Sequence, residues 1–225
     1  FEGSFTRITV ADGLNTNRIE CAFEDQEGSL WVGTSSGGLN RLRDGQFTTL
    51  TRKDGLVDEM VWAVFQSSTG GMWVGTEGGV THREGGSSHN YTVVEGLSDN
   101  VVNSISEDSN GNVWVGTYNG ITVFKPELLR TIGKESGLPG QDVRALSPAG
   151  EGMWVGIMGA GVVRLVDQKV IETFNESNGL VSNEVRVLLV GRGDTLWVGT
   201  NRGLSRIRGD GVESFGHKDG FIDSR

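Results

Sequence analysis

The sequence is poor in cysteine, in proline and in long hydrophobic runs, and each scarcity excludes a class of protein. Cys21 is the single cysteine among 225 residues, so no intramolecular disulfide can form. The three prolines exclude a proline-rich linker or a disordered proline tract. The longest apolar stretch, Val185 to Val190, contains Arg186 and is far shorter than the ~20 residues of a membrane span. We therefore expect no membrane contact by this segment.

Positive charge is also in deficit. The chain has 20 Lys and Arg residues against 29 Asp and Glu residues, which gives a net charge of -9 at pH 7. Nucleic acids and anionic membranes are bound by basic faces, because their phosphate groups attract Lys and Arg. The composition therefore predicts no nucleic-acid partner.

Glycine is abundant, at 36 residues, and much of it belongs to two repeated motifs. The tetrapeptide Trp-Val-Gly-Thr, with Ile157 in place of Thr in the fourth copy, begins at Trp31, Trp73, Trp114, Trp154 and Trp197. Gly-Leu pairs recur with the same period, at Gly13, Gly55, Gly96, Gly137 and Gly179, with Gly220-Phe221 as a partial sixth copy. The tryptophans are 42, 41, 40 and 43 residues apart, and a period of ~40 to 45 residues is typical of four-stranded propeller blades.

Alternation of apolar and polar residues in the first repeat predicts strands at 18–24, 30–34, 39–43 and 47–51. We therefore predict an all-β fold, a β-propeller of about five four-stranded antiparallel blades that is either complete or a segment of a larger propeller. The predicted organisation is a single domain over 1–225 with repeat units at about 10–51, 52–94, 95–133, 134–175 and 176–216. Residues 1–9 are expected to supply a closing outer strand, and 217–225 a poorly anchored partial repeat.

The five motif tryptophans are interpreted as structural, because a residue shared by every repeat serves the blade. Each such ring buries ~150 to 250 Å² and is expected to wedge between successive blades. The glycine that follows is expected to let neighbouring backbones approach closely.

The candidate ligand site lies where the repeats differ. The positions on either side of Ile19, Val61, Val102, Val143 and Val185 carry unrelated side chains, and they are expected at the mouth of the central channel if these strands are innermost. The loop after each Trp-Val-Gly-Thr is expected to emerge on the same face. The predicted ligand-binding residues are Arg18, Glu20, Met60, Trp62, Asn103, Tyr118, Asp142, Arg144, Glu184 and Arg186.

Three guanidinium groups and one or two aromatic rings suit an acidic oligosaccharide, because guanidinium makes paired hydrogen bonds with carboxylate or sulfate. A second interpretation is that the charged residues of this set pair across neighbouring blades inside a wet channel. Trp62 likewise has two interpretations, a ligand contact or a side chain that fills the channel.

The best single copy of the repeat runs from Gly96-Leu97 through Val102, Glu107-Asp108 and Trp114 to Thr117, followed by Gly120-Ile121. This pattern resembles the two-component regulator propeller repeat over essentially the whole chain. The fourth unit departs from it, with Ala149-Gly150 in place of the Asp turn. The resemblance implies a sensor region of a hybrid histidine kinase, diguanylate cyclase or related bacterial regulator, in the periplasm or outside the cell. Such sensors are commonly seven-bladed, whereas five units are present here.

Function is accordingly predicted as non-catalytic binding of a small ligand, with no cofactor and no metal. The alternatives are a scaffold that binds a protein partner and, less favoured, a propeller enzyme of the virginiamycin B lyase type. Histidines are poorly placed for catalysis, with His82 expected on a third strand, His89 in the loop after it and His217 in the partial repeat.

Overall fold

A computed structural model describes residues 6–125 and 128–221, in two compact units, Phe1–Tyr91 and Thr92–Arg225. Every sheet of the described residues is four-stranded and antiparallel, and in each sheet the neighbouring strands follow one another in chain order. The predicted all-β class and the five four-stranded blades are therefore confirmed.

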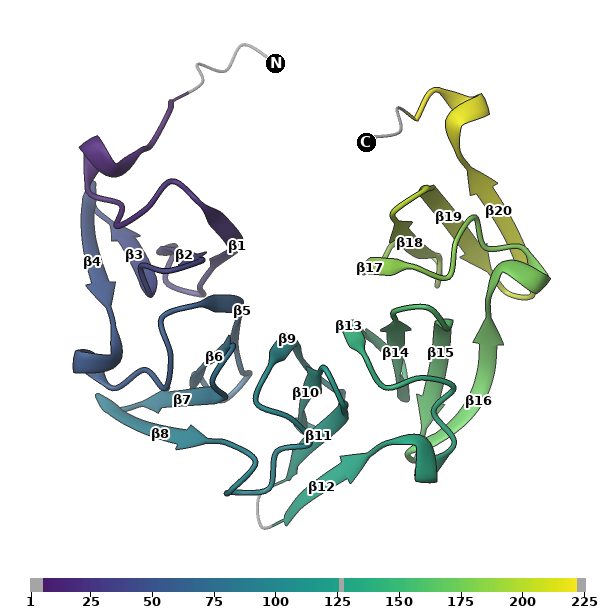
Figure 1. The fold of residues 1–225 in the computed structure, drawn as a ribbon, viewed down its shortest axis with the longest axis horizontal. Helices are drawn as coiled ribbons and strands as arrows, with labels where there is room; N and C mark the ends of the chain where they lie inside the picture. The colour runs from purple at the N-terminus through teal and green to yellow at the C-terminus, as the bar shows by residue number, and fades with distance from the viewer. Residues whose placement is uncertain (1–5, 126–127, 222–225) are drawn as a thin grey trace. The chain divides into compact units, whose positions relative to one another are not determined.

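The first unit contains two sheets (Figure 1). Figure 1 shows their first strands, β1 and β5, side by side. The strands are β1 (Ile19–Glu24), β2 (Leu30–Thr34), β3 (Leu39–Arg43), β4 (Gln46–Leu50), β5 (Val61–Gln66), β6 (Met72–Thr76), β7 (Val80–Glu84) and β8 (Ser87–Tyr91). The four strands predicted for the first repeat agree with these bounds to within one residue at each end.

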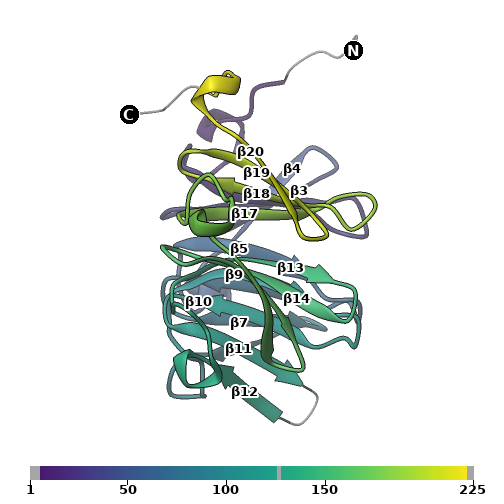
Figure 2. The ribbon, with the colours of Figure 1, turned by 90° about the vertical axis from the view of Figure 1, so that its right-hand side faces the viewer.

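The second unit contains three sheets, whose first strands are β9, β13 and β17. Figure 2 shows β17 to β20 following one another in order across the last sheet. The strands are β9 (Val102–Glu107), β10 (Val113–Thr117), β11 (Gly120–Lys125), β12 (Leu128–Ile132), β13 (Val143–Ala149), β14 (Gly152–Ile157), β15 (Gly161–Val166), β16 (Lys169–Phe174), β17 (Val185–Val190), β18 (Leu196–Thr200), β19 (Gly203–Arg208) and β20 (Gly211–Phe215).

The outer strand of the last sheet is β20, which pairs with β19 from Gly211 to Phe215. The outer strand of the last sheet thus comes from the segment near the C-terminus. Residues 1–5 of the predicted closing strand lie outside the described residues, and residues 6–9 form no strand. A closing role for residues 1–9 stays a prediction.

In four of the five Gly-Leu copies the glycine ends a single 3-10 turn that leads the chain to a first strand, and one further turn of this kind ends at Gly220. The glycine takes a left-handed conformation, with φ of 96° at Gly55 and 116° at Gly179, which side chains with a Cβ rarely adopt. The leucine is buried in every copy, as Leu56 at 3% exposure illustrates. The turns are η1 (Val10–Asp12), η2 (Arg52–Asp54), η3 (Lys134–Ser136), η4 (Glu176–Asn178) and η5 (His217–Asp219).

The glycine of Trp-Val-Gly-Thr makes room for the first strand of the next sheet. A Cβ on Gly116 would lie 2.7 Å from Cγ1 of Val143, and a Cβ on Gly156 would lie 2.6 Å from Cγ1 of Val185. Both valines are fully buried in the core of the second unit. The close approach predicted for these glycines is therefore confirmed, and it explains why the motif tolerates no side chain there.

The same contact joins the two sheets of the first unit, where a Cβ on Gly33 would lie 2.7 Å from Cγ1 of Val61. Ile19 occupies the equivalent position in the first sheet but is 45% exposed. The prediction that this position is uniformly core is therefore wrong for Ile19, because no described residue of its unit covers that side of β1.

The motif tryptophans differ in burial along the chain. Trp31, Trp73 and Trp114 are 8%, 6% and 6% exposed, whereas Trp154 and Trp197 are only half-buried. Trp197 lies in the last sheet, on a face that no other sheet of the second unit covers. The predicted structural role thus holds most fully for the first three.

Candidate functional site

The predicted ligand-binding residues lie at the beginning of the first strand of each sheet or in the loop after the second strand. Arg18, Glu20, Met60 and Trp62 belong to the first unit. The other members belong to the second unit, and they are Asn103, Tyr118, Asp142, Arg144, Glu184 and Arg186.

A backbone hydrogen bond repeated in all five sheets brings the two segments together. The N–H of the first residue after Trp-Val-Gly-Thr donates to the carbonyl that precedes the first strand of the same sheet, with lengths between 2.9 and 3.2 Å. The predicted emergence of this loop beside the first strand is therefore confirmed. The pairs are Ser35 to Arg18, Glu77 to Met60, Tyr118 to Val101, Met158 to Asp142 and Asn201 to Glu184.

Four of the predicted residues in the second unit form one connected cluster. Arg144 and Asp142 make a two-point ion pair, with Nε to Oδ1 at 2.7 Å and Nη2 to Oδ2 at 2.8 Å. Nδ2 of Asn103 donates to the carbonyl oxygen of Val143 at 3.0 Å and lies 3.4 Å from Oδ1 of Asp142. The guanidinium of Arg144 lies 5.6 Å from the ring centroid of Tyr118.

This cluster presents an aromatic ring to solvent beside a fixed charge pair. Tyr118 is 54% exposed, while Asp142 and Arg144 are half-buried. A cation over a ring face within ~6 Å is held by the ring quadrupole, so Arg144 orients Tyr118 from one side. The exposed ring then offers a flat apolar surface bordered by hydrogen-bonding groups, a combination that suits a sugar ring.

Glu184 and Arg186 lie on either side of Val185 at the start of β17. Glu184 forms an isolated bridge with Met158, and Arg186 is exposed. Within residues 6–125 and 128–221, neither side chain forms an ion pair. Arg186 is therefore a guanidinium with its hydrogen-bonding capacity available to a ligand.

The predicted residues of the first unit make fewer contacts. Arg18 is exposed and Glu20 is half-buried, and among the described residues neither makes an ion pair. Trp62 is half-buried, and its indole Nε1 is buried with no acceptor in the part of the chain that the structure describes. The one ion pair of the charged set among the described residues joins Asp142 and Arg144, which belong to the same blade and not to neighbouring ones.

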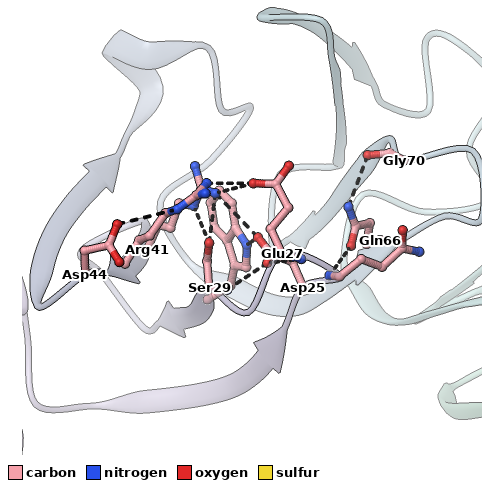
Figure 3. Close-up of polar contacts among 10 residues, drawn as sticks. Asp25, Glu27, Ser29, Arg41, Asp44, Gln66 and Gly70 are labelled. Carbon is pink, nitrogen blue, oxygen red and sulfur yellow. Dashed lines mark hydrogen bonds and ion pairs between the residues drawn. The ribbon is translucent and has the colours of Figure 1, made fainter.

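A polar cluster that sequence analysis missed surrounds the first motif tryptophan (Figure 3). Nε1 of Trp31 donates to Oδ2 of Asp25 at 2.8 Å, and the guanidinium of Arg41 lies 5.2 Å from the Trp31 ring centroid. Nη2 of Arg41 donates to Oγ of Ser29 at 2.8 Å and pairs with Oε2 of Glu27 at 3.3 Å. These contacts clamp the indole ring from its edge and its face.

The pairing of the second and third strands shows how this cluster arises, because each motif tryptophan lies directly opposite one residue of the third strand. The residue opposite the motif tryptophan on the third strand is Arg41, His82, Val123, Arg164 or Arg206. Arg164 and Arg206 lie over Trp154 and Trp197 at 5.7 Å, and His82 stacks on Trp73 at 4.2 Å. A cationic or aromatic residue ten positions after the tryptophan at Arg41 and Arg164, or nine positions after it at His82 and Arg206, therefore marks the outer half of the blade.

The histidines of the second sheet are structural. His82 lies on β7 as predicted, but His89 lies in β8, directly opposite His82, and not in a loop. His89 also packs 4.6 Å from Tyr91, centroid to centroid. Both histidines therefore sit on the third and fourth strands, away from the first strands that carry the candidate site.

Among the described residues, no group of three or more His, Cys, Asp or Glu side chains is arranged to hold a metal ion. Within the same residues, no helix has the length and apolar character to cross a membrane.

Comparison with known proteins identifies the repeat. The family model described as two component regulator propeller matches residues 13–36, 55–78 and 96–119. No curated protein sequence matches the chain.

Solved structures with the same fold include extracellular domains of two-component and one-component systems. The extracellular domain of a protein described as a hybrid two component system from B. thetaiotaomicron is 24% identical, with a TM-score of 0.81 over 95% of this chain and 30% of that one. The extracellular domain of a one component system from the same organism is 26% identical, with a TM-score of 0.71 over 90% of this chain and 29% of that one. The chain therefore spans about a third of the length of these proteins.

Enzymes share the fold as well. A catalytically inactive virginiamycin B lyase from Staphylococcus aureus is 14% identical, with a TM-score of 0.71 over 88% of this chain and 69% of that one. At this identity the likeness concerns the fold alone.

Proposed function

Because this chain carries two-component regulator propeller repeats, we propose that it is a non-catalytic, ligand-binding part of a bacterial sensor, located in the periplasm or outside the cell. The location rests on the two structures described as extracellular domains of regulatory systems. The candidate site, at the ends of the first strands, is the part of the repeat that varies from blade to blade.

The observation that carries this proposal is the exposed ring of Tyr118, held by the ion-paired Arg144. A ring oriented in advance loses little freedom when a ligand stacks on it, which lowers the entropic cost of binding. The neighbouring Asp142 and Asn103 supply hydrogen-bond acceptors and donors for hydroxyl groups.

We propose an acidic oligosaccharide as the ligand. The charge of Arg144 is neutralised by Asp142. Arg186 is exposed and has no ion pair among the described residues, so it is the guanidinium that would attract an acidic group of the ligand. A guanidinium binds a carboxylate or sulfate through two parallel hydrogen bonds. The stacking surface and the anion contact thus come from different sheets of the second unit.

Titration calorimetry with a panel of acidic and neutral oligosaccharides tests the proposal. We expect binding of an acidic member that weakens with added salt, because exposed charge pairs are screened. Tyr118→Ala and Arg186→Ala should each weaken binding by about tenfold or more without a shift in the unfolding midpoint. Arg130→Ala, an exposed arginine on the outer strand β12, is the matched control and should bind like the wild type.

Binding that does not depend on salt, or no binding across the panel, would contradict the acidic ligand. Binding of neutral sugars that still requires Tyr118 would keep the site and change the ligand class. Conversion of any oligosaccharide into a new product would contradict the non-catalytic assignment.

A protein-interaction scaffold is the second candidate function. It is favoured by large apolar side chains exposed on the last sheet, Val187 at 57% and Leu189 at 64%. Contiguous exposed apolar surface marks binding faces for macromolecules.

A further inference from the structure

A pocket of about 290 Å³ opens between the fourth and fifth sheets of the second unit. It lies at the opposite end of β13 from the candidate site described above, so it is a separate place on the blade. Four of its lining residues also belong to the hydrophobic core between these two sheets, and they are Trp154, Val190, Leu196 and Ile207. The last sheet therefore contributes to the pocket with the face that packs against the fourth sheet.

The equivalent position between the third and fourth sheets is almost filled, with a pocket of about 70 Å³. There Oδ2 of Asp108 accepts hydrogen bonds from Nε1 of Trp114 and from Nδ2 of Asn112, each at 2.8 Å. Strand register makes Ala149 the counterpart of Asp108. The connection between β13 and β14 is also shorter than that between β9 and β10. Loss of the carboxylate and of part of the turn thus opens the larger pocket.

The first sheet shows which group binds to a motif tryptophan and an arginine at this position. Arg41 lies opposite Trp31 on the third strand. The carboxylate of Asp25 contacts both, with Oδ2 at 2.8 Å from Nε1 of Trp31 and at 3.7 Å from Nη2 of Arg41 (Figure 3). A carboxylate is therefore the natural partner of this pair of side chains.

The fourth sheet keeps the same pair but has no carboxylate for it. Arg164 lies opposite Trp154, with its guanidinium 5.7 Å from the ring centroid. Ala149 takes the place of Asp25, so the turn offers no carboxylate to Nε1 of Trp154. A carboxylate from a ligand could occupy this place and accept the same hydrogen bonds.

A second contact of the arginine is lost as well. In the first sheet Nε of Arg41 donates to Oγ of Ser29 at 3.0 Å. The counterpart of Ser29 is Gly152, which has no side chain. Nε of Arg164 is buried with no acceptor among the described residues, while its Nη1 pairs with Oε1 of Glu172 at 3.0 Å. A buried donor without an acceptor is unfavourable, so an incoming acceptor is stabilised at this position.

The rim of the pocket carries negative charge. Asp194 lies in the turn between β17 and β18, and Asp210 in the turn between β19 and β20. Both of these rim aspartates are exposed, and within residues 6–125 and 128–221 neither forms an ion pair. With Glu172, the pocket has three carboxylates against the one guanidinium of Arg164. A simple anion is repelled by this excess, whereas a ligand that also carries an ammonium group is attracted.

The size and the apolar lining limit the rest of the ligand. A volume of about 290 Å³ is close to the lower limit of ~300 Å³ for small-molecule sites. We propose that the pocket binds a free amino acid with an apolar side chain. Its carboxylate contacts Trp154 and Arg164, its ammonium group contacts the rim aspartates, and its side chain packs on the apolar residues between the two sheets.

Titration calorimetry of the whole wild-type chain with three probes tests the proposal. L-Leucine carries both charges, 4-methylpentanoate lacks the amino group, and 3-methylbutylamine lacks the carboxylate. We expect L-leucine to bind, and each of the other two to bind more weakly by about tenfold or more, because each loses one charge-assisted contact. No binding of L-leucine, L-methionine or L-phenylalanine at millimolar concentration would overturn the proposal. Binding of 4-methylpentanoate as tight as that of L-leucine would overturn the amino-acid assignment.

Two variants test the carboxylate contact. Ala149→Asp supplies the carboxylate from the chain itself, as in the first sheet, and should weaken L-leucine binding by about tenfold or more because it occupies the same place. Arg164→Gln should weaken binding of L-leucine and of 4-methylpentanoate by about tenfold, without an effect on 3-methylbutylamine. Arg130→Gln, at an exposed arginine of β12, is the matched control and should bind all three probes like the wild type.

The double variant Asp194→Asn with Asp210→Asn tests the ammonium contact. It should weaken L-leucine binding by about tenfold and should strengthen binding of 4-methylpentanoate, because the repulsion of an anion is removed. Wild-type affinity for L-leucine in Arg164→Gln, at a wild-type unfolding midpoint, would show that the ligand does not use this pocket. The comparison of the three probes is made on the wild-type chain, so it decides the ligand class however the variants fold.

Discussion

The buried carboxylate of Asp25 accepts a hydrogen bond from the indole of Trp31 at 2.8 Å, and Asp108 accepts one from Trp114 at the same distance. The aspartate belongs to the turn between the first two strands, and the tryptophan to the second strand. The hydrogen bond therefore fixes the turn between the first two strands to the indole ring of the motif tryptophan. Burial by itself raises the pKa of Asp25, but hydrogen bonds from Trp31 and from the Ser29 N–H outweigh it and lower the pKa.

Lowering of the Asp25 pKa makes stability depend on pH. In the unfolded chain the Asp25 carboxyl has the ordinary aspartate pKa of about 4, and in the folded protein its pKa is lower. Its ionised form therefore stabilises the folded protein above about pH 4, and this stabilisation is lost as the pH falls through the folded-state pKa. Asp25→Asn should reduce the free energy of unfolding at neutral pH by about 1 to 3 kcal/mol and should flatten its decline in acid. Urea titrations at several pH values measure both effects. Asp44→Asn, at a side chain that is 93% exposed, should change neither.

Removal of a motif tryptophan should cost more than removal of the site tryptophan. Trp114→Ala should lower the free energy of unfolding by about 3 to 5 kcal/mol, because the ring is 6% exposed and leaves a large cavity. Trp62 is only half-buried, so Trp62→Ala should cost clearly less. Denaturant titrations compare the two, and equal losses would contradict the division between structural and site tryptophans.

Addition of even a methyl group to the motif glycine should lower the stability of the fold. Gly116→Ala should destabilise the protein by about 1 to 3 kcal/mol, because the new Cβ would lie 2.7 Å from Val143. Gly133→Ala is the matched control, since no atom lies within 4 Å of a Cβ there and the backbone is extended, with φ of -138°. Thermal melts of the two variants should differ, and a wild-type melting temperature for Gly116→Ala would show that the sheets can separate at no cost.

Cys21 should react slowly in the folded protein. Burial raises the pKa of its thiol to about 11, so the thiolate that attacks a disulfide reagent is scarce at neutral pH. We expect the rate of labelling to be lower than that of a free thiol by roughly two orders of magnitude, and to recover in denaturant. Rapid labelling under native conditions would indicate that β1 opens locally.

Much of the fold could be predicted from the sequence, because the repeat compares the chain with itself. Strand positions followed from alternation, and the role of Gly33, Gly116 and Gly156 followed from their recurrence beside tryptophan. Ile19 could not be predicted as exposed, since its side chain is the right type for a core. Its burial depends on which sheet stands beside β1, and a repeat sequence does not encode that.

The segments that carry the candidate residues were predictable from the sequence, whereas the contacts among these residues were not. The strand pattern places Asp142 and Arg144 at a first strand and Tyr118 in the loop after a second strand. Backbone hydrogen bonds between each loop and the first strand of its sheet bring these two kinds of segment together. The ion pair between Asp142 and Arg144 was one of several pairings open to the charged residues of the set, and the strand pattern does not choose among them. The clamp on Trp31 was missed because Arg41 is adjacent to it only across the sheet.

The hydrogen bond that joins each loop to its first strand uses only backbone atoms, from Ser35 to Arg18 in the first sheet and from Asn201 to Glu184 in the last. No side chain at these positions is needed to hold the two segments in place. The blade thus separates the atoms that maintain its shape from the side chains of the candidate ligand site. Such a chain can exchange its recognition residues one blade at a time, by substitution or by duplication and recombination of whole repeats, and acquire a new specificity without passing through an unstable intermediate.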